Sequence, residues 1–220
     1  MRMTLKCLLV AAMTLAVTPA FAPAFADAIE DGETVYKTKT CMACHGIKGA
    51  RPVLSYPMLA GQNEKYLLTQ LKDIKAGKRV GTNDPATGHP YIQGMLDIMH
   101  LVEDKDLENV AKYLASLPPG KPKAIDPPPA PELLAAGEAA FNKLGCKACH
   151  GKDAMKPTAK NYPYISGLNA EYLTRAMTEI RDKLRVNGQS KLMFGTIKKA
   201  SDEDIAAMAA WLSTLDRSAQ

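Results

Sequence analysis

An internal duplication constrains the fold of this chain more than any other feature. The pentapeptide Cys-Met-Ala-Cys-His at 41–45 returns as Cys-Lys-Ala-Cys-His at 146–150. Two further pairs of segments match, at offsets of 106 and 98 positions: 56–79 with 162–185, and 106–117 with 204–215. Because a sequence repeat of this length is a structural unit in its own right, we expect two similar domains in tandem.

Apolar side chains recur at helical spacing in each copy. In the first copy a helix is expected from near Asn63 to Gly77, and in the second copy the matching stretch runs from Tyr172 to Leu184. The last helix of each copy has apolar residues at i, i+3, i+4, i+7 and i+10, along 107–117 and 205–215. Ser-x-x-Asp at 201–204 predicts a capping box before the second of these helices. No stretch alternates as a strand does, so the predicted fold class is all-α.

Aromatic residues and glycines also occupy matched positions in the two copies. The pairing predicts that the first and last helices of each copy pack through an aromatic contact, Tyr36 with Tyr113 and Phe141 with Trp211. Gly32 and Gly137 each stand four residues before the first aromatic residue of a pair. A residue without a side chain lets two helices approach closely, so we expect the helices to cross at these glycines.

A proline-rich stretch separates the copies. Residues 118–131 contain seven prolines in fourteen residues, a composition typical of a stiff, extended linker. The predicted organisation is therefore an N-terminal domain at 27–117, this linker, and a C-terminal domain at 132–220.

The first 26 residues have the pattern of a secretory signal peptide. A short basic stretch ends at Lys6, an apolar run extends from Cys7 to Val17, and the small-residue pattern Ala-Phe-Ala ends at Ala26. The apolar run is about half of the roughly 20 residues that a membrane-spanning helix needs. We therefore expect cleavage near Ala26 and a periplasmic protein with at most peripheral membrane association. Four cysteines would remain, all within the two pentapeptides.

Cys-x-x-Cys-His is the signature of covalent haem attachment, because its two thiols can bond the two vinyl groups of one porphyrin and its histidine then faces the iron. A thioredoxin-like redox pair would need a βαβ context, and a zinc site would need four ligands. The second copy has no histidine or cysteine outside its pentapeptide. We therefore predict two covalently bound haem c groups, attached through Cys41 and Cys44 and through Cys146 and Cys149, with iron ligands His45 and His150.

The repeat also predicts the sixth iron ligands. Methionine is the distal partner of histidine in electron-transfer cytochromes c, and its thioether raises the reduction potential. Among eleven methionines, Met95 and Met193 form the pair at matched positions, each ahead of the acidic start of a last helix. Met99, His89 and His100 are the alternatives to Met95 in the first copy.

Charge argues against nucleic-acid binding and distinguishes the two halves. Without Arg2 and Lys6 the chain has 26 basic and 23 acidic side chains, an excess too small for a nucleic-acid-binding protein. Residues 27–120 carry 11 basic and 12 acidic side chains, whereas residues 121–220 carry 15 and 11. The second half is therefore expected to dock an acidic protein partner.

Over nearly all of its length after the signal peptide, the chain resembles the dihaem cytochrome c4 family. The first half carries the motifs most fully, with Cys-x-x-Cys-His-Gly at 41–46, Pro-Met-Leu-Ala-Gly-Gln at 57–62 and Tyr-Leu-Leu-x-Gln-Leu-x-Asp-Ile-Lys-Ala-Gly at 66–77. The resemblance implies two tandem class I cytochrome c domains about a pseudo-twofold axis, with neighbouring haems and histidine–methionine ligation. It also implies a periplasmic carrier between a quinol-oxidising complex or dehydrogenase and a terminal oxidase.

The second half departs from the family pattern. It has Ile-Ser-Gly-Leu at 165–168 in place of Leu-Ala-Gly-Gln, and its approach to Met193 is short. This half also resembles the dihaem subunit of flavocytochrome c sulfide dehydrogenases, so the second hypothesis is a haem subunit bound to a flavoprotein. A haem enzyme with one vacant iron, such as a peroxidase, is the third. Two six-coordinate irons leave no position for a substrate, which favours an electron-transfer protein over an enzyme.

Overall fold

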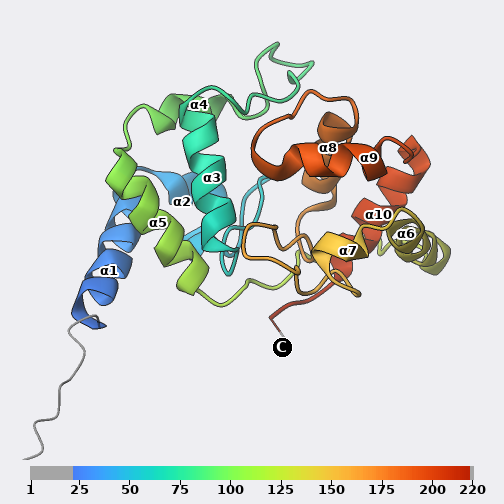
Figure 1. The fold of residues 1–220 in the computed structure, drawn as a ribbon, viewed down its shortest axis with the longest axis horizontal. Coiled ribbons are helices and arrows are strands. Elements are labelled where there is room, and N and C mark those ends of the chain that lie inside the picture. The colour runs from blue at the N-terminus through green and yellow to red at the C-terminus, as the bar shows by residue number, and fades with distance from the viewer. Residues whose placement is uncertain (1–21, 219–220) are drawn as a thin grey trace, which may run out of the picture.

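The computed structural model describes residues 22–218, and its helices form two groups that lie next to each other (Figure 1). The first group contains α1 (Ala22–Thr38), α2 (Cys41–His45), the 3-10 turn η1 (Ile47–Gly49), α3 (Glu64–Lys75), α4 (Gln93–Met99) and α5 (Asp104–Ser116). The second contains α6 (Pro131–Lys143), α7 (Lys147–His150), α8 (Ala170–Arg181), η2 (Gly188–Met193), α9 (Phe194–Ile197) and α10 (Asp202–Thr214). Over residues 22–218 no strand forms, and Asn83 and Pro90 make one isolated bridge. The predicted all-α fold with two tandem domains is confirmed.

The helix ends follow the local signals in the sequence. α3 ends at Lys75 and is followed by Gly77, whose φ of 66° is one that a glycine adopts without strain. α10 begins at the predicted capping box: the Asp204 backbone N–H donates to Ser201 Oγ at 3.1 Å, and the Ser201 N–H donates to Asp204 Oδ2 at 3.2 Å. The capping box is therefore confirmed.

In each domain the first and last helices cross at the predicted glycine. A Cβ atom on Gly32 would lie 2.1 Å from the carbonyl oxygen of Asn109, and one on Gly137 would lie 2.1 Å from that of Ala207. The aromatic contacts follow one turn later, with ring centroids 5.8 Å apart in the first domain and 5.2 Å apart in the second: Tyr36 with Tyr113, and Phe141 with Trp211. Both predicted packing contacts are present.

Each domain has its own hydrophobic core, and one residue joins the two. The first core gathers buried side chains from α1, α3, α4 and α5, among them Tyr36, Leu67 and Leu107. The second core gathers side chains from α6, α8, α9 and α10, and it also includes Met58, which is 5% exposed and belongs to the first domain's sequence. The two domains therefore share apolar packing.

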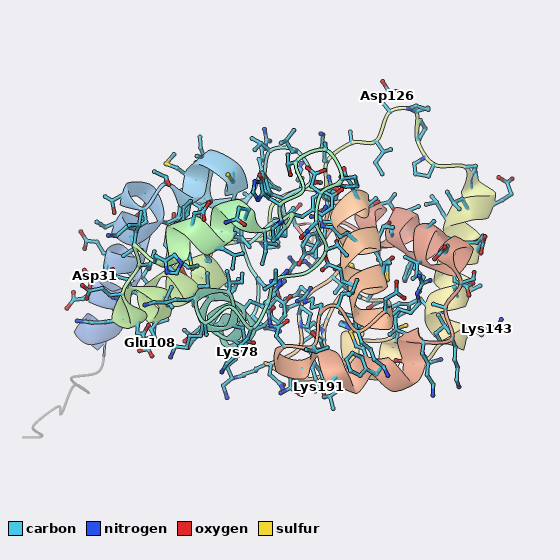
Figure 2. The ribbon with its side chains drawn as sticks, turned by 90° about the horizontal axis from the view of Figure 1, so that it is seen from above. Asp31, Lys78, Glu108, Asp126, Lys143 and Lys191 are labelled. Carbon is cyan, nitrogen blue, oxygen red and sulfur yellow. The ribbon has the colours of Figure 1, made fainter. Side chains whose placement is uncertain are left out.

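The segment between α5 and α6 first follows the surface of the first domain and then leaves it. A Cβ on Gly120 would lie 2.3 Å from the carbonyl oxygen of Ala50, so the backbones touch there. Figure 2 shows Asp126 on a loop that stands away from the helices. Pro131 is the first residue of α6. Proline suits this position because the backbone N–H that it lacks would have no partner within the helix. The domain boundaries at 117 and 132 remain predictions.

Most of the predicted signal peptide, residues 1–21, lies outside the described residues. Because α1 begins at Ala22, cleavage after Ala26 would remove the first five residues of that helix. Over residues 22–218, no helix is both long enough and apolar enough to span a bilayer.

Candidate haem sites

One continuous cavity runs through both domains, with a lining that is mainly apolar. All the residues predicted to hold the two haems line it: Cys41, Cys44, His45 and Met95 from the first domain, and Cys146, Cys149, His150 and Met193 from the second. The structure therefore brings each pentapeptide together with its predicted methionine, and it joins the two sets across the domain interface.

The two histidines have the same setting. His45 ends α2 with Nδ1 3.0 Å from the carbonyl oxygen of Pro57, and His150 ends α7 with Nδ1 3.3 Å from that of Pro163. When Nδ1–H donates to a carbonyl, the lone pair of Nε2 is left for a metal and the ring is held in place. Nε2 of His45 is buried and has no hydrogen-bond partner among the described residues. An unpartnered ring nitrogen facing an apolar cavity fits an iron ligand.

Burial sets the protonation of these side chains. It lowers the pKa of both imidazoles, which favours the neutral form that binds a metal. Burial also raises the pKa of the Cys41 and Cys146 thiols to about 11, whereas thioredoxin-like pairs have a lowered thiol pKa. Within residues 22–218, no cluster of three or more histidine, cysteine or acidic side chains could hold a metal ion. The residues thus fit a haem better than a redox disulfide or a zinc ion.

The candidate distal ligands differ in whether they line the cavity. Met95 lies in the first turn of α4 and Met193 ends η2, and each packs partly buried against the core of its own domain. Met99 is 2% exposed and lines the same cavity. His89 and His100 are exposed and do not line it. The choice of Met95 over Met99 remains a prediction that rests on the repeat.

Two arginines meet in the cavity at the domain interface. Arg185 is 4% exposed and donates to Gln70 Oε1 at 2.9 Å and to Tyr66 Oη at 3.1 Å. Arg79 donates to the same Gln70 oxygen at 3.1 Å and to Tyr172 Oη at 3.3 Å. Among the described residues, no carboxylate forms an ion pair with either guanidinium, and Nε of Arg185 has no partner. Because a buried cation is costly without an anion, this place fits the carboxylates of a porphyrin.

Backbone and side-chain hydrogen bonds join the domains next to this cluster. Gln62 is 4% exposed; its Nε2 donates to the Tyr164 carbonyl at 2.8 Å, and its Oε1 accepts from the Tyr164 N–H at 2.8 Å. Arg217 donates to the Gly61 carbonyl at 3.1 Å and stacks 4.3 Å from the centre of the Tyr164 ring. The amide of Gln62 therefore pairs with the opposite backbone as a neighbouring strand would.

Several of these residues had no role that the sequence predicted. Pro57 and Pro163 were visible only as matching positions in the repeat, yet their carbonyls orient the two histidines. Gln62 and Leu168 occupy matching positions of the two copies but have different environments: Gln62 bonds across the interface, whereas Leu168 is buried in the second core.

Comparisons with known proteins agree with this geometry. The family model described as cytochrome c matches residues 29–118 and 134–216. Cytochrome c4 of Azotobacter vinelandii is 35% identical over 189 residues, covering 81% of this chain and 86% of the relative. A thiosulfate dehydrogenase electron acceptor of Stutzerimonas stutzeri is 27% identical over 198 residues, covering 84% of this chain and 86% of the relative. The crystal structure of reduced recombinant cytochrome c4 from Pseudomonas stutzeri superposes with a TM-score of 0.69 at 32% identity, covering 85% of this chain and 98% of the other.

Two family matches, one for each pentapeptide, together with full-length relatives, establish the cofactor as two covalently bound haem c groups. They also establish the chain as an electron-transfer protein rather than an enzyme. The chain therefore belongs to the cytochrome c family and, within it, to the dihaem cytochromes c4.

Proposed function

We propose that this protein is a periplasmic carrier that takes electrons one at a time from a quinol-oxidising complex or a dehydrogenase and passes them to a terminal oxidase. The observation that carries the proposal is the single cavity lined by both pentapeptides and by Met95 and Met193. Filled coordination at both irons leaves no site for a substrate, so the chemistry belongs to the redox partners.

The eight predicted haem-binding residues each have a defined part in this function. Cys41 and Cys44 would form the thioethers of the first haem, and His45 and Met95 would hold its iron. Cys146, Cys149, His150 and Met193 would do the same for the second. The bound haem supplies the reversible one-electron change of its iron. Backbone carbonyls hold the two imidazoles in place, and the apolar lining of the cavity would keep water away from a bound haem and favour a high potential.

The surfaces around the two attachment sites differ, which supports two docking faces. Exposed lysines surround the second pentapeptide: Lys143, Lys147, Lys152, Lys156 and Lys160. Exposed apolar side chains adjoin the first, namely Met42, Ile47, Val53 and Leu54, together with the exposed cations Lys48 and Arg51. Figure 2 shows Lys143 at the opposite end of the molecule from Asp31 and Glu108. A basic face steers an acidic partner, whereas an apolar face suits a neutral one.

Stopped-flow oxidation by the acidic redox partner tests this docking. Rates at low salt should fall as ionic strength rises, and Lys152→Glu combined with Lys156→Glu should lower them by roughly tenfold. Lys198→Glu, on the same domain but outside this patch, is the matched control and should change the rate little. A rate that is independent of salt, or an equal loss in the control, would reject docking through the second domain.

A subunit role in a dehydrogenase is the second candidate, and the similarity to a thiosulfate dehydrogenase electron acceptor favours it. The two candidates differ in what accompanies the protein. Purification from the native cells should yield the free dihaem chain with its mature N-terminus at Asp27. A dehydrogenase polypeptide, with or without flavin, co-purifying at equal stoichiometry would replace the carrier proposal with the subunit one.

A further inference from the structure

A buried carboxylate of the second domain reaches into the first. Glu179 on α8 is 7% exposed, and its Oε1 accepts hydrogen bonds from the backbone N–H and the hydroxyl of Thr82, both at 2.9 Å. A Cβ on Gly81 would lie 2.6 Å from that oxygen, so the loop approaches the carboxylate this closely because residue 81 is a glycine. No ion pair joins Glu179 to a cation within the described part of the chain. The two hydrogen bonds from Thr82 therefore offset the free-energy cost of burying the Glu179 carboxylate.

From Thr82 the contacts continue to the methionine of the first domain. The Thr82 carbonyl accepts from the Tyr91 N–H at 3.1 Å, and the Ile92 carbonyl accepts from the Met95 N–H at 2.9 Å. Arg175, also on α8, places its guanidinium 4.4 Å from the centre of the Tyr91 ring. The second domain therefore holds both ends of the loop that leads into α4.

The first domain holds the methionine segment of the second in the same way. Asn187 is 5% exposed, and its Nδ2 donates to Asp73 Oδ2 at 2.8 Å and to Gln70 Oε1 at 3.2 Å, both on α3. Asn187 directly precedes η2: its carbonyl accepts from the Ser190 N–H at 3.1 Å, and the turn ends at Met193. Asp73 and Glu179 stand 106 positions apart, the offset of the repeat in this region.

We propose that each domain positions the distal methionine of the other, through Glu179 on Thr82 for Met95 and through Asp73 on Asn187 for Met193. This inference rests on the proposed methionine ligation. A methionine leaves its iron only if the segment that carries it can swing outward. Opening either segment breaks hydrogen bonds to the opposite domain, so the stability of each iron–sulfur bond depends on the partner domain. Glu179 and Asp73 are positioning residues and touch neither iron.

Competition with added imidazole measures how easily each methionine is displaced. Imidazole is titrated into the oxidised, haem-loaded protein, and the two haems are followed by their shifted NMR methyl signals, assigned with Met95→Ala and Met193→Ala. Glu179→Ala removes both hydrogen bonds from Thr82 and should strengthen imidazole binding at the first haem by roughly tenfold or more, since losing even one charge-assisted hydrogen bond is enough for that factor. Binding at the second haem, in the domain that carries the substitution, should not change. Asp73→Ala should give the reverse pattern.

Two further variants separate positioning from a general loss of stability. Glu179→Gln keeps an oxygen for Thr82 and should restore most of the normal imidazole affinity. Glu171→Ala removes an exposed carboxylate from the first turn of the same helix and should leave both haems unchanged. An effect of Glu179→Ala confined to the second haem, or equal at both, would overturn the inference. Absence of methionine-ligand signals in the unsubstituted protein would instead overturn the ligation on which it rests.

Discussion

The helix crossing at Gly137 offers a sharp test of the packing. A Cβ at this position would lie 2.1 Å from the Ala207 carbonyl oxygen, 2.6 Å from its carbonyl carbon and 2.8 Å from Trp211 Cβ. Two of these atoms belong to the backbone of α10, so no side-chain rotation can relieve the clash. Gly137→Ala therefore requires α6 and α10 to move apart by about 1 Å, since real Cβ atoms keep ordinary van der Waals distances from such neighbours.

The expected cost follows from this geometry. Overpacking a well-filled site costs about 1–3 kcal/mol, and a backbone clash places Gly137→Ala near the upper limit. Alanine recovers about 1 kcal/mol because it favours the helix over glycine. The net loss in unfolding free energy is about 2 kcal/mol. Because the two domains are expected to unfold together as a unit of about 150–250 residues, each kcal/mol lowers the melting temperature by about 2–4 °C, so a decrease of about 6 °C is expected.

Thermal unfolding of the haem-loaded protein, followed by far-ultraviolet circular dichroism, measures this decrease. Gly195→Ala on α9 is the matched control, because nothing lies within 4 Å of a Cβ built there. It should leave the melting temperature unchanged or raise it slightly. Equal melting temperatures for Gly137→Ala and Gly195→Ala would refute the close helix crossing.

Two other perturbations have defined outcomes. Gln62→Leu leaves the Tyr164 N–H and carbonyl without partners and should weaken the domain interface by about 2 kcal/mol. Calorimetry should then resolve two separate domain transitions. A single transition, unchanged from that of the unsubstituted protein, would contradict this expectation. Ser201→Ala removes the cap of α10 and should cost about 1 kcal/mol in denaturant unfolding, whereas no change would argue against the cap.

Contacts that the repeat encodes were predictable from the sequence. A glycine and two aromatic residues occupy matching positions in both copies: Gly32, Tyr36 and Tyr113 in the first, and Gly137, Phe141 and Trp211 in the second. Because the same pattern occurs twice, each copy supported the packing predicted for the other. The capping box at Ser201 was equally accessible, because it depends on residues three apart in the chain. Local spacing and duplication together gave the fold class and the haem attachment.

Contacts between the domains were not predictable. Gln62 and Tyr164 stand 102 positions apart, and Arg185 and Gln70 stand 115 apart, so no periodic pattern links them. The amide of Gln62 and the guanidinium of Arg185 would suit an exposed surface equally well. Their roles depend on the relative placement of two folded domains, which repeat spacing does not specify. The carbonyls of Pro57 and Pro163 were missed for another reason: each lies in the same domain as its histidine, but the contact depends on how the intervening loop folds and not on helical spacing.

The ligation of each haem iron by one histidine and one methionine is tested most directly by near-infrared absorption of the oxidised protein, which reports sulfur bound to ferric haem. Met95→Ala and Met193→Ala should each remove about half of this band, because only one of the two irons keeps its thioether ligand in each variant. Met99→Leu, at a buried core position on the same helix as Met95, should keep the whole band. A band that survives Met95→Ala intact, or one that Met99→Leu halves, would contradict the assignment of Met95 as the ligand of the first haem.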